Sequence, residues 1–90
     1  MAEPYRSTPV FDEATLPAAL RSDHSTKAGV WGVIRVLEGR LRLRYADPPA
    51  ERILESGEAG LCLPQQVHSV EPLGAVKMRV DFYDTDPSRI

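Results

Sequence analysis

VWGVIRVLEGRLRLRY, residues 30–45, is the stretch of the sequence that decides the fold. It contains two runs with the composition of β-strands, Val30–Leu37 and Arg40–Tyr45. Glu38-Gly39 stands between them, and a glycine adopts the positive φ that a tight two-residue turn requires. The stretch therefore predicts a β-hairpin that turns at Glu38-Gly39.

The second run alternates arginine with apolar residues, which places its basic side chains on one face of the strand. These side chains are Arg40, Arg42 and Arg44. One interpretation is an anion-binding stripe. The other, typical of half-buried strands, is a solvated face that pairs with Glu51 or Glu55 on a neighbouring strand. We expect no nucleic-acid partner, because the net charge is −2, with 11 basic and 13 acidic residues.

Eight prolines and six glycines divide the chain into short segments. STPVF predicts a short edge strand, because Pro9 cannot donate a backbone hydrogen bond. One helical turn is expected at Pro17–Leu20, and RILES, LCLP and VHSVE each have the composition of a short strand. In AVKMRVDFY, residues 75–83, Val76, Met78, Val80 and Phe82 form one face and Lys77, Arg79, Asp81 and Tyr83 the other. This organisation predicts an all-β antiparallel barrel or sandwich with about one turn of helix.

Ninety residues predict one domain, which we expect to span residues 5–85 with flexible ends at 1–4 and 86–90. The start, MAEPYRST, lacks the apolar core of a signal peptide, and no apolar run approaches membrane-spanning length. Cys62 is the single cysteine and stands between leucines, so we expect a buried, inert thiol in a cytoplasmic protein. The small core and the edge strand at Pro9 predict a homodimer.

Two histidines, His24 and His68, are the residues best suited to hold a divalent metal ion. Neutral imidazoles from separate strands, together with one carboxylate, would leave coordination positions open for water or substrate. The alternative is that both rings only form hydrogen bonds inside the core. On a strand, His68 and Val70 face the same way, so an inward Val70 predicts an inward His68 in a cavity shared with His24.

The segment GEAGLCLPQQVHSVEP resembles the second motif of cupins, and the hairpin segment resembles the end of their first motif. The wider pattern LPAAL, HSTKAGVWG, LEGRL and VHSVE resembles one small cupin-like family. This family is the domain found at the N-terminus of TehB-type tellurite-resistance proteins and as stand-alone YeaR-type proteins. The resemblance implies a single antiparallel cupin-like β-barrel or jelly-roll sandwich.

The resemblance also implies that His24 and His68 stand close to the metal-binding histidines of cupins. Gly32 and Pro72 stand where cupins generally have a glutamate and an asparagine, so a third ligand must come from elsewhere. Asp81 is the preferred third ligand, and Glu71 or water is the alternative. Lys27 is either a solvated lysine or one that pairs with an acid or an anionic ligand.

The resemblance therefore implies a metal-binding protein that takes a small molecule or oxyanion in a tellurite or oxyanion stress response. Zn, Fe(II), Ni and Mn all suit two imidazoles with a carboxylate and water. The chain has no room for the methyltransferase domain of TehB, so we expect no tellurium methylation by this chain alone. Two alternatives stay open: a metal-dependent non-haem enzyme of the oxygenase or isomerase type, and a metal-free structural or interaction module.

Overall fold

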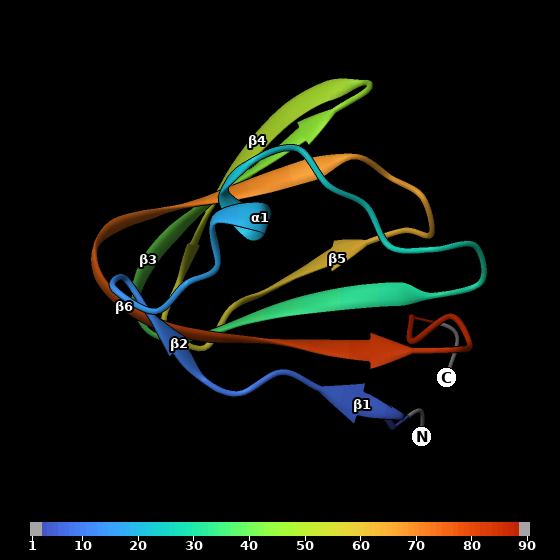
Figure 1. Cartoon of the computed structure of the whole chain (residues 1–90), viewed down its shortest axis with the longest axis horizontal. Coiled ribbons are helices and arrows are strands. Elements are labelled where there is room, and N and C mark those ends of the chain that lie inside the picture. Colours follow the sequence, from blue (N-terminus) through green and yellow to red (C-terminus); the bar gives the residue numbers. More distant parts are fainter. Residues whose placement is uncertain (1–2, 89–90) are drawn as a thin grey trace.

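Two long antiparallel strands, β3 (Trp31–Ala46) and β6 (His68–Tyr83), form the centre of the fold. The computed structural model describes residues 3–88. Each strand is 16 residues long, and the two pair along nearly their whole length, from Trp31 opposite Tyr83 to Tyr45 opposite His68. Figure 1 shows that both strands bend in the middle, so that their halves diverge into two layers.

The bend in β3 lies at Gly39, where the sequence predicted a hairpin turn. The ladder between β3 and β6 is instead interrupted by two register shifts, between Val36 and Glu38 and between Gly39 and Leu41. Gly39 has a φ of +79°, so its conformational freedom serves a β-bulge and not a turn. The hairpin prediction was therefore wrong. The two short strands expected within residues 67–83 are likewise one continuous strand, β6.

Four shorter strands within residues 3–88 complete the two layers. In the first half of β3, residues 31–36 pair with residues 78–83 of β6, and in the second half, residues 41–45 pair with residues 68–72. β5 (Ala59–Cys62) lines the free edge of the first half of β3, and β4 (Pro49–Glu55) lines that of the second half. β1 (Arg6–Ser7) and β2 (Phe11–Asp12) pair with the last part of β6.

Pro9 and Pro17 both lie at the boundaries of elements, but the single edge strand predicted over STPVF is divided into β1 and β2. Pro9 lies between β1 and β2, where its missing N–H costs no ladder bond. The one described helix, α1 (Ala18–Arg21), is a single turn that Pro17 precedes. The predicted all-β fold, a small antiparallel cupin-like barrel or sandwich with about one helical turn, is confirmed.

The apolar faces of the strands pack between the two layers. The largest fully buried side chains are Ile34, Leu41, Leu43, Leu54, Met78, Val36 and Cys62. The arginines of the second half of β3 point the other way. Arg42 lies 2.8 Å from Glu51 and 2.6 Å from Glu71, and Arg44 lies 3.5 Å from Glu51, whereas no ion pair joins them to Glu55. The solvated-face interpretation of this stripe is confirmed.

The ends of the chain are described only in part. Of the expected flexible ends, residues 1–2 and 89–90 lie outside the described residues. Near the other end, the Asp86 carboxylate accepts hydrogen bonds from the backbone N–H and the hydroxyl of Ser88. No helix within residues 3–88 has the length and apolarity needed to cross a lipid bilayer.

A Gly39→Ala substitution tests the bend. A Cβ at this position would lie 2.0 Å from the backbone oxygen of Ala75, and the φ of +79° is itself unfavourable for alanine. We expect a loss of about 3–4 kcal/mol in the free energy of unfolding, measured by urea denaturation. Gly74→Ala is the matched control, because Gly74 also has a positive φ but a Cβ there meets nothing within 4 Å. It should cost only about 1–2 kcal/mol, and equal losses in the two variants would contradict the close approach.

The homodimer expected from the sequence stays a prediction. β4 lies at the end of the strand order, so one side of it has no neighbouring strand among the described residues. An uncovered strand edge invites pairing with a second copy. Sedimentation at tens of micromolar should show a dimer, and a monomer under these conditions would reject the prediction.

Candidate functional site

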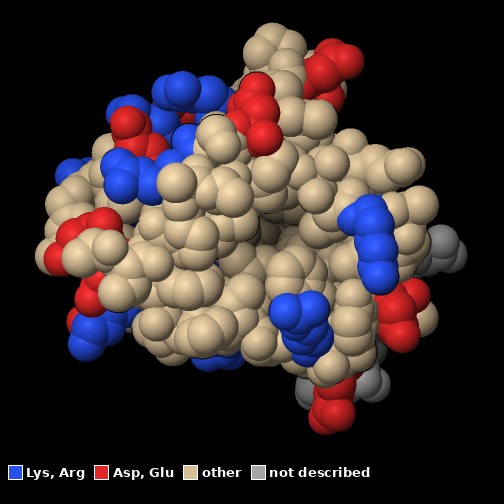
Figure 2. Space-filling view, in the orientation of Figure 1, with Lys and Arg blue, Asp and Glu red and all other residues tan. Residues whose placement is uncertain are grey.

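A cavity of about 440 Å³ opens between the two layers. Figure 2 shows it as a hollow in the centre of one face, surrounded mostly by uncharged surface. Its wall is largely apolar: Leu20, Val30, Ile34, Cys62, Val70, Met78, Val80 and Phe82. Its polar members are Tyr5, Arg6, Thr8, His24, Ser25, Thr26, Lys27 and His68. A concave, mainly apolar space of this size with a few polar groups is typical of small-molecule binding sites.

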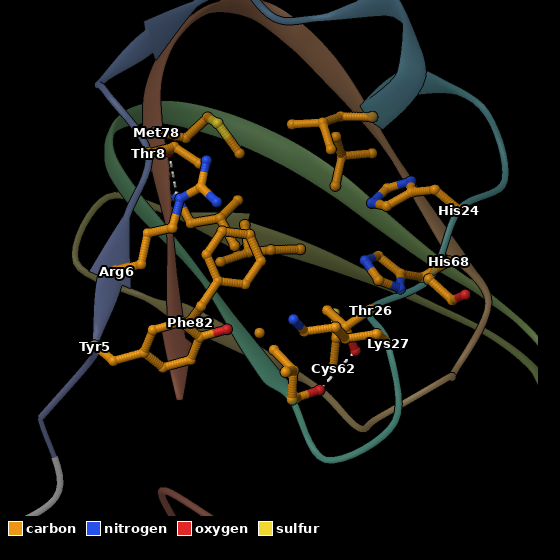
Figure 3. A pocket seen from close by; sticks show the side chains of 17 residues that line it. Tyr5, Arg6, Thr8, His24, Thr26, Lys27, Cys62, His68, Met78 and Phe82 are labelled. Carbon is orange, nitrogen blue, oxygen red and sulfur yellow. Dashed lines mark hydrogen bonds between the residues drawn. The ribbon is translucent and has the colours of Figure 1, made fainter. Parts of the chain in front are cut away.

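The backbone places the two histidines side by side on the cavity wall. His24 and His68 exchange both backbone hydrogen bonds, with N···O distances of 2.9 and 2.8 Å, in an isolated antiparallel bridge. Residues directly opposite each other in such a pair point their side chains to the same face. The ring centroids lie 4.2 Å apart with the planes at 60°, and both rings point into the cavity (Figure 3). Val70 also lines the cavity and is buried, so the predicted inward direction of His68 is confirmed.

Each imidazole is oriented by its own chain segment. The Nδ1 atom of His24 lies 2.9 Å from the carbonyl oxygen of Ser22, and the Nδ1 atom of His68 lies 2.8 Å from that of Gln66. A carbonyl oxygen only accepts, so both Nδ1 atoms donate, and in the neutral rings the lone pair lies on Nε2. Within residues 3–88, no hydrogen bond involves either Nε2 atom. The two Nε2 lone pairs are therefore available to a ligand in the cavity.

The His68 ring is neutral at pH 7. Burial lowers the pKa of His68 below its ordinary value of 6.5, and the neighbouring His24 lowers it further. The hydrogen bond to Gln66 opposes this shift without cancelling it. A neutral ring with a free Nε2 can accept a hydrogen bond or bind a metal ion.

Asp81 does not lie beside the histidines. The expectation that its carboxylate joins His24 and His68 in one cluster is therefore wrong. Its carboxylate accepts hydrogen bonds from Ser7 (2.7 Å), Arg35 (2.6 Å) and Arg79 (3.0 Å). Val80, like every second residue of this part of β6, lines the cavity, so Asp81 points to the opposite face of the strand. Burial by itself would raise the pKa of Asp81, but its three hydrogen-bond donors outweigh burial and lower it.

Glu71, the alternative third ligand, also lies elsewhere. It pairs with Arg42 on the outer face of the second layer, 2.6 Å away. Among the described residues, no group of three or more His, Cys, Asp or Glu side chains is arranged to hold a metal ion. The structure therefore brings His24 and His68 together without a protein carboxylate.

Cys62 contributes to the cavity wall but is fully buried. Burial raises the pKa of its thiol to about 12, so almost no thiolate exists at neutral pH. The inert thiol expected from the sequence agrees with this position.

Two cationic side chains line the cavity, and the sequence indicated only one of them. Lys27, from the loop before β3, was considered as a possible anion-binding group, whereas Arg6, on β1, was missed. The alternation in the short N-terminal segment is too brief to show which face of the sheet it covers. A basic residue in an edge strand was the only signal in the sequence, and it is a weak one.

The pKa of His68 predicts how stability depends on pH. The unfolded chain, with the ordinary histidine value of 6.5, takes up a proton at a higher pH than the folded chain does. Stability should therefore fall as the pH drops through 6.5 toward the lower pKa of the folded state. Urea denaturation in EDTA should give a lower free energy of unfolding at about pH 5.5 than at about pH 7.5, by an amount that shrinks in a His68→Gln variant. The same pH dependence in both proteins would contradict the buried neutral ring.

Comparisons with known proteins relate the chain to one family. The family model described as TehB-like domain matches residues 6–80. Two proteins of Haemophilus influenzae strains, both described as probable S-adenosyl-L-methionine-dependent methyltransferase TehB, are 34% and 32% identical to the chain over 74 residues. These matches cover 77% of this chain but only 26% of each relative.

Solved structures show the same relationship. The crystal structure of TehB from Haemophilus influenzae superposes with a TM-score of 0.81 at 30% identity, over 89% of this chain and 30% of that one. A protein from E. coli strain K12 superposes with a TM-score of 0.83 at 22% identity, over 94% and 92% of the two chains. FeII HppE shares only the fold, with a TM-score of 0.64 at 20% identity over 82% of this chain and 40% of that one.

The family match spans most of the chain, and the fold agrees over nearly all of it. The chain therefore belongs to the TehB-like domain family.

Proposed function

We propose that this TehB-like domain binds a divalent metal ion through His24 and His68 and a small molecule or oxyanion in the cavity beside them. One observation carries the proposal. The two imidazoles stand together on the cavity wall with their Nε2 lone pairs free of hydrogen bonds from any described residue.

Two features of the donor set suit a metal ion. Metal-binding histidines commonly donate the second ring N–H to a backbone carbonyl, and both histidines here do so. Burial keeps His68 neutral, as a ligand must be. Two imidazoles without a carboxylate do not fit a closed structural site, but they fit a site that water or a ligand completes.

The metal ion would supply open coordination positions next to the cavity, where an anionic oxygen can bind. Zn, Fe(II), Ni and Mn all accept imidazole with oxygen ligands, and the two histidines do not discriminate among them. The role in a tellurite or other oxyanion response, which the TehB relationship suggests, is part of this proposal. The chain spans about a quarter of the curated TehB relatives, so their methyltransferase activity is not assigned to it.

Metal titration of the chain without an affinity tag tests the proposal. Metal-stripped protein should take up about one ion per chain when Zn, Ni, Mn or Fe(II) is added under oxygen-free conditions, as measured by calorimetry and elemental analysis. His24→Gln and His68→Gln should each weaken binding at least about tenfold, because each removes one of two protein ligands.

Glu71→Gln is the matched control, because Glu71 is an ionisable residue that the structure places on the outer face. It should leave metal affinity unchanged, and circular dichroism should confirm that every variant is folded. Metal uptake that survives both histidine substitutions, or that Glu71→Gln reduces equally, would reject the proposal.

A further inference from the structure

We infer that the ligand of the cavity is an organic anion with an apolar body, rather than a bare inorganic oxyanion. This inference rests on the proposed use of the cavity as a ligand site, but it does not require the metal ion. Its basis is the charge at the mouth of the cavity and the chemistry of the wall.

The charge at the cavity is opposite in sign to that of the chain. Arg6 and Lys27 both line the cavity, and neither side chain has an ion pair or hydrogen bond within residues 3–88. The chain carries a net charge of −2, yet none of its 13 acidic residues lines the cavity. Two unbalanced cations at a concave, partly apolar site favour an anion.

The apolar wall of the cavity favours a ligand that is more than a charged group. The innermost lining residues, including Ile34, Val70 and Met78, are buried and apolar. A small inorganic oxyanion keeps its hydration shell and gains nothing from such a wall. An apolar body of suitable size gains free energy in proportion to the apolar surface that it removes from water. The wall therefore favours a ligand that has an apolar organic part as well as a charged group.

The cations and the apolar wall are arranged to suit an amphiphilic anion, with the cations at the entrance and the apolar side chains inside. Arg6 and Lys27 are exposed and reach the cavity from opposite sides of the view in Figure 3, on β1 and on the loop before β3. The apolar side chains lie deeper. The charged head of a ligand would thus lie at the mouth, where both cations attract it, while its apolar tail would extend inward past the histidine pair.

Calorimetry with matched probes tests the inference on metal-stripped protein in EDTA. The probes are sodium hexanoate, the neutral hexanamide, and sodium tellurite as a bare oxyanion. Hexanoate should bind at least about tenfold more tightly than hexanamide, because only the carboxylate carries a charge opposite to that of Arg6 and Lys27. In the series from butanoate to octanoate, each methylene should strengthen binding about fourfold until the cavity is full. Tellurite should bind more weakly than hexanoate.

Charge-removing variants locate the head group. Lys27→Met and Arg6→Met keep a flexible, unbranched side chain without its charge, and each should weaken hexanoate binding about tenfold while changing hexanamide binding much less. Arg40→Met is the matched control, because it removes the same charge from an exposed residue that does not line the cavity. It should change hexanoate affinity less than about twofold in physiological salt.

Four outcomes would overturn the inference: tellurite binding at least as tightly as hexanoate, equal affinity for hexanoate and hexanamide, an equal effect of Arg40→Met and Lys27→Met, or no binding of any carboxylate at millimolar concentration. Failure of the metal proposal gives a different result. Hexanoate binding without metal uptake would reject the metal site alone. Metal uptake without discrimination between acid and amide would reject the anion alone.

Discussion

The pairing of β3 with β6 through a shared bend is the constraint on which the rest of the structure depends. A straight ladder of two 16-residue strands would bury only one face and would enclose nothing. The register shifts around Gly39 turn the ladder so that its halves face each other. Only glycine suits this position, because Ala75 of β6 leaves no room for a Cβ. The apolar core and the cavity are both consequences of this bend.

The bend also gives the two faces of β6 different surroundings. On one face, Met78, Val80 and Phe82 line the cavity. On the other, Asp81 joins Ser7 of β1 to Arg35 of β3, with Arg79 beside it. Burying a carboxylate is costly unless it is paired and hydrogen-bonded, and these three partners satisfy it. Asp81 therefore links β1 to the central ladder. Its side chain points to the face of β6 opposite the cavity, away from the histidines.

The histidine pair depends on a second, smaller constraint, the single bridge between His24 and His68. Two reciprocal backbone hydrogen bonds suffice to place the imidazoles side by side, although the residues lie far apart in sequence. The carbonyls of Ser22 and Gln66 then direct both free nitrogens toward the cavity. This arrangement, together with Arg6 and Lys27 at the mouth, forms the ligand site that we propose for the domain.

The sequence by itself determined the strand-rich composition, the alternation that buries Leu41, Leu43 and Met78, the helical turn after Pro17, and the inward direction of His68. Each follows from a period of two residues or from the missing N–H of proline, which are local properties. The same alternation already separated Asp81 from Val80 and Phe82, so its assignment to the cavity was an error of interpretation, not a lack of signal. Tertiary structure alone decided that Gly39 makes a bulge and not a turn, because a positive φ serves either purpose until a partner strand is present. It also decided that Arg6, Lys27 and the two histidines share one cavity. That outcome depends on strand registers between residues far apart in the chain, about which a local pattern carries no information.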